Sequence, residues 1–334
     1  MKPASVTVFR NASELPPEWD TVVGTGFMTR TLLQLLENIN PCSQQYHFAS
    51  TPSSSSVAVT YRHHLNLFSF ARNICSWSIS MNITGVPCSV AAPGLTLGSP
   101  DSAALLLNHL ASRPGLTIVL NTTDPTLGPG FISGPTLPTF RIPVAWSDFS
   151  SYLSALRSTY RRRIHLAMSR GANLKVDALT DKERFDNSLY TLYLNVFHRS
   201  QYPLECLPIA FFRSYPGVIT VFRDGPAPAG FVQTLRQGDR LLFLFGGLDY
   251  SKLKSNDTYL NMLLYIIRLG IESGCREIDL GQTAGISKLR LGAKMMPLYL
   301  HATHPSPLAR WILRRTSRSL SYEIPLEMPR VFHN

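Results

Sequence analysis

The chain has 334 residues, of which 44% are hydrophobic and 16% charged, so it can form a sizeable core and is long enough for two domains. Its longest apolar stretches fall well short of about 18 residues, which predicts no membrane span. Residues 1–10 have no apolar run behind a basic leader, which argues against a secretory signal. Five scattered cysteines contain no CxxC pair, which argues against a disulfide framework or a zinc site and favours a reducing cytoplasm.

The net charge of +11 belongs entirely to the second half of the chain. Residues 1–150 contain 7 Lys and Arg against 7 Asp and Glu, whereas residues 151–334 contain 25 against 14. A localised positive field indicates a polyanionic partner, such as a phosphorylated co-substrate, RNA or an anionic membrane face. The alternative is a solvated basic surface without a ligand.

In the first half, short strands and helices are predicted between loops rich in turn-forming residues. The apolar pattern favours strands at Val6–Phe9, His47–Ser50, Val57–Tyr61 and Leu116–Leu120, and helices at Arg30–Asn38 and Ser102–Ser112. The segment Asn121–Pro143 is dense in proline and glycine, which predicts an irregular crossover into the second half.

The second half has a clearer order of elements. Ser147 and Asp148 are typical caps for one continuous helix that ends at Gly171. Two Gly-containing turns join three runs of β-type residues, which predicts antiparallel hairpins over residues 217–248. The remaining expected elements are helices at Asp181–Arg199 and Thr258–Ser273, strands at Glu277–Leu280 and Pro297–His301, and a helical or irregular Gly285–Leu291.

Two segments of the second half carry a family resemblance. Residues 152–171 read YLSALRSTYRRRIHLAMSRG, and residues 277–297 read EIDLGQTAGISKLRLGAKMMP. Both are similar to runs in GNAT-like N-acyltransferases, in the branch related to Fem-type peptidoglycan aminoacyltransferases. The first half, through ELPPEWDTVV and the helix after it, resembles a degenerate companion unit of the same kind.

The resemblance implies an α/β (α+β) GNAT-like fold, in which helices flank a mixed, largely antiparallel sheet. One central strand splays from its neighbour to admit the donor. Two GNAT-like units are implied: a degenerate N-terminal unit over residues 1–145, and an acyltransferase domain with the donor site over residues 146–334. The implied activity is direct transfer of an acyl group from acyl-CoA or acyl carrier protein to an amine, with no metal and no permanently bound cofactor.

The loop before the helix at Thr258 departs from the pattern of typical acetyl-CoA users. Those proteins have an Arg/Gln-x-x-Gly-x-Gly/Ala loop whose backbone N–H groups hold the pyrophosphate, whereas residues 250–257 read YSKLKSND, without glycine. Fem-type relatives share this absence and take aminoacyl-tRNA, which makes aminoacyl-tRNA an alternative donor here. A non-catalytic GNAT-like module that holds RNA or anionic lipid is a further alternative.

The candidate donor-binding residues come from these segments. A helix N-terminus flanked by lysines is a natural phosphate seat, but Asp257 can cap the same N–H groups and repel an anion, so ordinary capping is an equal alternative. The donor-binding candidates are Gly246, Gly247, Lys252, Lys254, Ser255, Asn256, Gly281, Gln282 and Arg290. A basic patch is formed by Arg161, Arg162 and Arg163, which spread over about 200° of a helix and cannot all face one site.

Acyl transfer to an amine requires a general base and hydrogen-bond donors toward the oxyanion. Position in the sequence favours Asp249 as the base and Tyr250 or Tyr202 as proton donor to the leaving group. The resemblance to the GNAT-like group implies that Lys288 lies near the donor or acceptor. A turn role for Asp249 and a surface role for Lys288 are the structural alternatives.

Two other segments have a weaker signal. The pair His301 and His304 lacks a carboxylate or cysteine at ligand spacing, so no metal site is predicted. The stretch Arg310–Arg318 is basic and amphipathic, which suits RNA, a membrane surface or ordinary packing.

Overall fold

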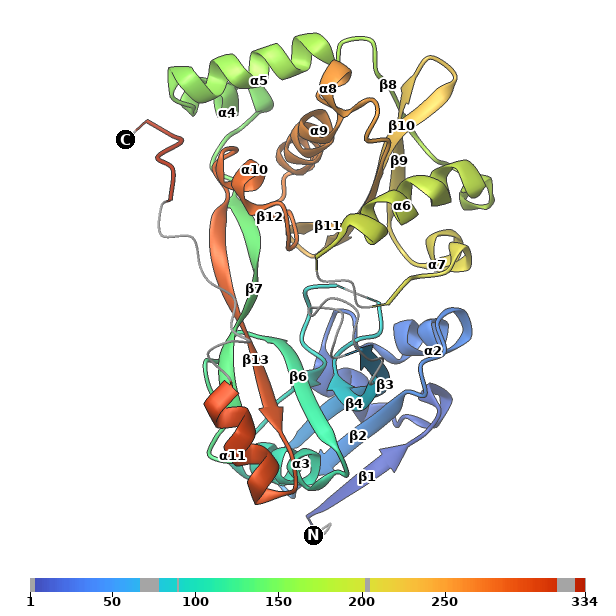
Figure 1. Cartoon of the computed structure of the whole chain (residues 1–334), viewed down its shortest axis with the longest axis vertical. Coiled ribbons are helices and arrows are strands. Elements are labelled where there is room, and N and C mark those ends of the chain that lie inside the picture. The colour runs from blue at the N-terminus through green and yellow to red at the C-terminus, as the bar shows by residue number, and fades with distance from the viewer. Residues whose placement is uncertain (1–3, 67–77, 89, 202–204, 317–327, 334) are drawn as a thin grey trace. The chain divides into compact units, whose positions relative to one another are not determined.

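The computed structural model describes residues 4–66, 78–88, 90–201, 205–316 and 328–333 (Figure 1). The chain divides into two compact units. Unit 1 consists of Met1–Leu137 and Pro297–Ile324, and unit 2 consists of Pro138–Met296 and Pro325–Asn334. Each unit therefore combines segments that are far apart in the sequence.

Unit 1 is an antiparallel meander followed by one parallel strand. Its strand order is β1-β2-β3-β4-β6-β13, with β5 beside β3. All neighbours are antiparallel except β4 and β6, which are connected through α3. The strands are β1 Ser5–Phe9, β2 Gln45–Ser50, β3 Ser55–Asn66, β4 Ser78–Thr84, β5 Leu95–Thr96, β6 Leu116–Thr122 and β13 Lys294–Thr303. The helices are α1 Glu18–Val23, α2 Arg30–Ile39, α3 Pro100–Ser112 and α11 Pro307–Thr316.

Unit 2 repeats this order with β8-β9-β10-β11-β12-β7. All neighbours are antiparallel except β11 and β12, which are connected through α9. The strands are β7 Ile132–Pro143, β8 Lys175–Ala178, β9 Val218–Asp224, β10 Ala227–Gln237, β11 Arg240–Leu248 and β12 Glu277–Asp279. The helices are α4 Phe149–Ala155, α5 Ser158–Arg170, α6 Asn187–Arg199, α7 Ile209–Ser214, α8 Leu253–Asn256, α9 Thr258–Glu272 and α10 Gly285–Leu289.

The last strand of each unit comes from the other half of the chain. Strand β13 follows β12 in sequence but pairs with β6, whereas β7 follows β6 but pairs with β12. This exchange explains why the units differ from the expected division at residues 145 and 146. It also makes part of the expected crossover Asn121–Pro143 a strand, because its last residues satisfy the backbone groups of β12.

The sheet of unit 2 buries side chains on both faces, as the alternation along β10 requires. Phe231 contacts the rings of Phe185 and Phe212 on one face, with ring centroids 5.1 and 5.9 Å away. The next residue, Val232, packs on the other face in a core to which α9 contributes Leu263 and Ile267. Both faces of the strand beside the open edge are therefore fixed by packing.

The expected continuous helix over residues 152–171 is wrong, because α4 and α5 are separated at Leu156 and Arg157. The C-terminal segment causes the break: Leu156 forms a β-bridge with Phe332, and the Arg157 N–H donates to the Val331 carbonyl at 2.9 Å. The expected cap is confirmed, since the Asp148 side chain accepts a hydrogen bond from the Ser151 N–H.

Gly247→Ala should lower the free energy of unfolding by about 1–3 kcal/mol, because a Cβ there would clash with the Phe231 ring and lie 2.8 Å from Leu192 Cβ. Gly130→Ala is a suitable control, since its Cβ would meet only Ala111 Cβ at 3.9 Å. Chemical denaturation of both variants measures the difference. Equal stabilities would contradict close packing behind β11.

Candidate functional site

Strands β11 and β12 are paired only at their beginnings. Residues 240–242 pair in parallel with residues 277–279. Beyond that point the chain of β12 follows β7 instead: the Leu280 N–H donates to the Phe140 carbonyl at 2.8 Å, and the Phe140 N–H donates to the Gly281 carbonyl at 3.2 Å. Strand β11 meanwhile stays paired with β10 to its end. Within the described residues, 243–248 therefore have no paired strand on their second edge.

A β-bulge lies where β11 leaves β12. Thr234 is opposite Phe243 and Gln233 is opposite Phe245, so Leu244 is an extra residue on β11. A bulge bends its strand and increases the twist, which explains why the two strands diverge here. In unit 1, by contrast, β4 stays paired with β6 through its last residue, Thr84. The equivalent strands of unit 1 therefore do not separate.

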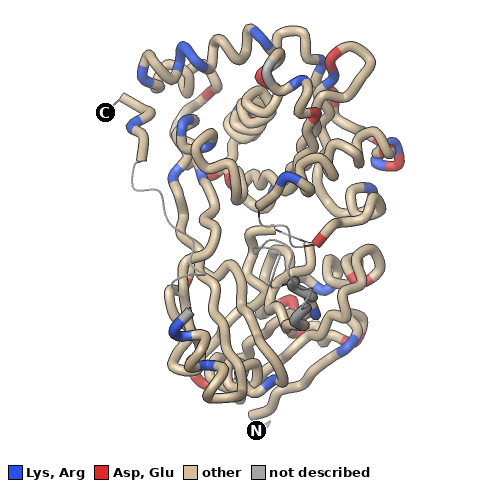
Figure 2. The backbone as a smooth tube through the Cα atoms, viewed as in Figure 1, with Lys and Arg blue, Asp and Glu red and all other residues tan. Residues whose placement is uncertain are grey.

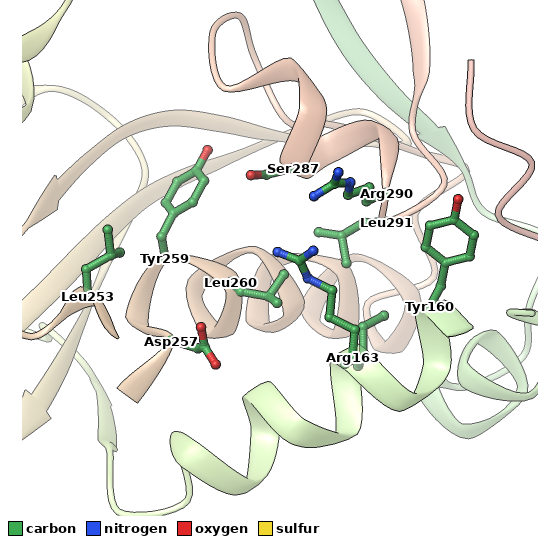
Figure 3. A pocket seen from close by; sticks show the side chains of 10 residues that line it. Tyr160, Arg163, Leu253, Asp257, Tyr259, Leu260, Ser287, Arg290 and Leu291 are labelled. Atoms are coloured by element: carbon green, nitrogen blue, oxygen red, sulfur yellow. The ribbon is translucent and has the colours of Figure 1, made fainter. Parts of the chain in front are cut away.

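A pocket of about 220 Å³ lies among α5, α9 and α10 of unit 2 (Figure 3). It is lined by Tyr160, Arg163, Ile164, Leu253, Asp257, Tyr259, Leu260, Ser287, Arg290 and Leu291. The pocket is at the N-terminal end of α9, where the first backbone N–H groups have no partner within the helix. The expectation that Asp257 caps these groups is wrong, because it has φ of 45° and its side chain makes no capping hydrogen bond.

The pocket carries more positive than negative charge. Arg163 and Arg290 both direct their guanidinium groups into it (Figure 3), and neither forms an ion pair with another described residue. The carboxylate of Asp257 is neutralised, since Arg170 Nη1 lies 3.0 Å from it. Guanidinium groups suit bidentate phosphate contacts, and the positive end of the α9 dipole acts in the same direction. The pocket therefore favours an anion of phosphate size.

The structure separates the three arginines of the predicted basic patch. Arg161 donates to the carbonyl oxygens of Ser154 and Leu156, at 3.3 and 3.4 Å, and so stabilises the junction of α4 and α5. Arg162 is exposed and does not line the pocket. Only Arg163 contributes to the pocket, as the rotation of 100° per residue along a helix requires.

The loop after β12 is strained, and hydrogen bonds from the Lys288 side chain hold it in place. Gly281, Thr283 and Ala284 all have positive φ, of 71°, 60° and 47°, a conformation that costs free energy in residues other than glycine. The Lys288 ammonium donates to the carbonyl oxygens of Gly281 and Gln282, at 3.1 and 2.5 Å. Gly281 and Gln282 thus contribute backbone acceptors to this fastening, beside the point where β11 and β12 separate.

Lys288 is buried, which corrects the interpretation of it as a surface residue. Its side chain is 1% exposed and lies over the Phe140 ring. Burial lowers the pKa of Lys288 from 10.5 to about 7, while Asp279 acts in the opposite direction. Within the described residues its contacts hold the loop in place.

Asp249 and Tyr250 follow directly after the open edge of β11. The Asp249 carboxylate accepts hydrogen bonds from the N–H and hydroxyl of Ser251, at 2.9 and 2.7 Å, and so takes part in the turn after β11. The Arg199 guanidinium stacks on the Tyr250 ring, 3.8 Å from its centroid. Burial raises the pKa of Tyr250, against the opposing effect of Arg199, so its hydroxyl stays protonated at neutral pH. Tyr202 lies outside the described residues.

The predicted lysine-flanked phosphate seat is only partly present. Lys252 forms an ion pair with Asp224 at 2.9 Å, which raises its pKa, and Ser255 donates to the Lys252 carbonyl at 3.1 Å. Asn256 ends α8, and the side chain of Lys254 lies outside the described residues. The cations that line the pocket come instead from α5 and the end of α10.

The two glycines of β11 are explained by packing. A Cβ at Gly246 would lie 3.1 Å from the Phe243 ring and 3.2 Å from the Phe231 carbonyl oxygen, and Gly247 faces the Phe231 ring. Both lie on the open edge segment, so their backbone groups remain candidates for donor contact.

Sequence analysis missed the pairing of Arg163 with Arg290 and the pocket roles of Tyr160 and Ser287. One signal was present: Arg163 and the buried Ile164 follow Tyr160 by three and four residues, which places all three on one face of α5. Which residue of α10 meets that face depends on the strained loop, whose conformation no local pattern specifies.

No group of three or more metal-ligating side chains is found among the described residues. Every helix in this part of the chain is too short or too polar to cross a bilayer.

The stability of the protein should depend on pH through Lys288. Its pKa is lower in the folded state, so the unfolded chain binds more protons between about pH 7 and 10. The free energy of unfolding should therefore rise with pH there, by up to about 1.4 kcal/mol per unit from this group.

Lys288→Met should remove that part of the slope, whereas Lys252→Met, at a surface ion pair, should keep it. Denaturant titrations at pH 7, 8 and 9 compare the three proteins. Parallel pH dependences for Lys288→Met and the wild type would refute the assignment.

Comparison with known proteins agrees with this architecture. Residues 154–286 match the family model of the acetyltransferase (GNAT) domain. No curated protein sequence matches the chain. Similar solved structures include L-PGS from Bacillus licheniformis, with 11% identity and a TM-score of 0.52, covering 85% of this chain and 94% of that one.

Two further structures are similar over most of the chain. FemX has 9% identity and a TM-score of 0.47, covering 80% of this chain and 89% of that one. A GCN5-related N-acetyltransferase from Sphaerobacter thermophilus has 10% identity and a TM-score of 0.44, covering 90% and 96%. The resemblance expected from the sequence is confirmed: the acetyltransferase (GNAT) domain model matches residues 154–286, which lie in unit 2.

Proposed function

We propose that unit 2 transfers an acyl group from a phosphate-bearing thioester, acyl-CoA or acyl carrier protein, to an amine. The observation that carries the proposal is the cationic pocket of Arg163 and Arg290 at the N-terminus of α9, in the same unit as the open edge of β11. A phosphate in the pocket and a thioester at the open edge are the two ends of one donor. The backbone N–H groups at the start of α9 add to the phosphate seat.

The proposed reaction is a direct attack without a covalent enzyme intermediate. The nitrogen of a neutral amine attacks the thioester carbonyl, the C–N bond forms, and the C–S bond breaks. Backbone N–H groups on the unpaired edge of residues 243–248 donate to the oxyanion. Asp249 accepts the proton of the nitrogen, and the protonated Tyr250 hydroxyl supplies a proton to the thiolate.

Arg163→Gln and Arg290→Gln should each weaken the binding of coenzyme A by roughly 5- to 30-fold, since a charge-assisted phosphate contact contributes about 1–2 kcal/mol at a partly exposed site. Arg162→Gln is the matched control, because it removes the same charge from the same helix outside the pocket. Isothermal titration measures the three dissociation constants. An equal loss of affinity for coenzyme A in Arg162→Gln would contradict the pocket, because it would show that only the overall positive charge of α5 attracts the ligand.

Aminoacyl-tRNA is the second candidate donor, and two observations favour it. The loop before α9 has no glycine, and the outer face of α5 exposes Arg162 and Arg170 beside the pocket. A polynucleotide would contact this wider surface, whereas coenzyme A would occupy the pocket alone.

Arg162→Gln therefore separates the two donors. If tRNA binds, the logarithm of its affinity should fall steeply with the logarithm of salt concentration, and Arg162→Gln should reduce that slope by about one contact. Filter binding of aminoacyl-tRNA at several salt concentrations measures both. A salt slope unchanged in Arg162→Gln would contradict contact between tRNA and α5.

A further inference from the structure

Helix α11 of unit 1 exposes its apolar side chains. Leu308, Trp311 and Ile312 are 67%, 53% and 48% exposed, whereas Ala309, Arg310 and Leu313 on the other side are half-buried. An amphipathic helix of a globular protein ordinarily turns its apolar stripe toward the core. Here the aliphatic and aromatic side chains are on the solvent side, at the spacing of i, i+3 and i+4 that places them on one face.

All charged residues of the same helix are cationic. Residues 305–316 contain Arg310, Arg314 and Arg315 and no acidic residue, whereas residues 1–137, which make up most of the unit's sequence, contain six Lys and Arg against six Asp and Glu. The Arg315 guanidinium lies 4.5 Å from the centre of the Trp311 ring, so charge and aromatic surface are adjacent. The arginines of α11 are drawn in blue on the backbone in Figure 2. The positive charge of this unit is thus concentrated around the exposed apolar face.

We propose that α11 docks on the surface of an anionic lipid bilayer, with Leu308, Trp311 and Ile312 in the headgroup region and the arginines on lipid phosphates. Aliphatic side chains are the deciding feature. A nucleic acid offers stacking partners for Trp311 but no apolar surface for Leu308 and Ile312, whereas a bilayer offers acyl chains to all three. Tryptophan also has a preference for the membrane interface. Arginines contribute electrostatic attraction to anionic headgroups.

Flotation of the full chain with phosphatidylglycerol-containing and with pure phosphatidylcholine vesicles tests the proposal. The wild type should float with the anionic vesicles and only weakly with the neutral ones. Leu308→Ser with Trp311→Ser should lower the partition coefficient by about tenfold or more, and Arg314→Gln with Arg315→Gln should lower it several-fold. Circular dichroism checks that these surface variants remain folded.

Leu166→Ser is the matched control, because Leu166 is 49% exposed on α5, another arginine-rich helix, and its loss should change flotation less than twofold. Trp311→Phe should still float but should lose part of the fluorescence quenching by brominated phosphatidylglycerol. Absence of the wild type from the anionic vesicles, an equal loss in Leu166→Ser, or unchanged quenching in Trp311→Phe would each overturn the proposal. A further outcome would also overturn it: the wild type does not bind vesicles, but it binds a single-stranded RNA, and the variant with Leu308→Ser and Trp311→Ser binds that RNA equally well. Vesicles carry no acyl donor, so the result is independent of the proposed transferase activity.

Discussion

Competition for backbone hydrogen bonds around β12 determines the rest of the site. At its beginning β12 pairs with both β11 and β7, but at Leu280 and Gly281 the backbone pairs with Phe140 of β7 and not with β11. Two neighbours that twist differently cannot both be followed, and the bulge at Leu244 gives β11 the stronger bend. The edge of β11 is therefore open because the chain after β12 pairs with β7 instead. Unit 1, where β4 keeps its partner to the last residue, has the same strand order without the opening.

The strained loop after β12 connects this opening to the pocket. Its positive-φ residues turn the chain from Asp279 into α10 within a few residues, and α10 leads to Arg290. The buried Lys288 donates hydrogen bonds to two carbonyl groups of the loop. Burying an amine costs free energy, but an apolar side chain at this position would leave both carbonyl groups without this donor. Buried charge is therefore used here to define a backbone conformation. Arg163 and Arg290, which form no ion pair with another described residue, leave their charges available to an anion.

Local patterns predicted most elements of unit 2, because hydrophobic period, Gly turns and acidic caps are all encoded within a few residues. The three strands over residues 217–248 and the α9 helix followed from such patterns. The features that were not predicted depend on residues far away in the sequence. The break between α4 and α5 requires residues 331 and 332, the strand β7 requires β12, and the burial of Lys288 requires the loop it supports. The pocket was not predicted for the same reason. Arg290 was expected as a donor contact, but the spacing of Arg161, Arg162 and Arg163 did not indicate which of these three would lie beside it.

The exchanged strands also determine which piece of the chain can form the opened sheet. A segment of residues 146–334 would lack β7, so β12 would have no partner except β11. Its free backbone groups would then favour continued pairing with β11, and continued pairing would close the edge at which we propose the donor binds. Residues 138–143 are therefore as much a part of the site as the arginines, although none of them lines the pocket. A GNAT-type unit of this kind depends on the first half of the chain for the strand that keeps it open.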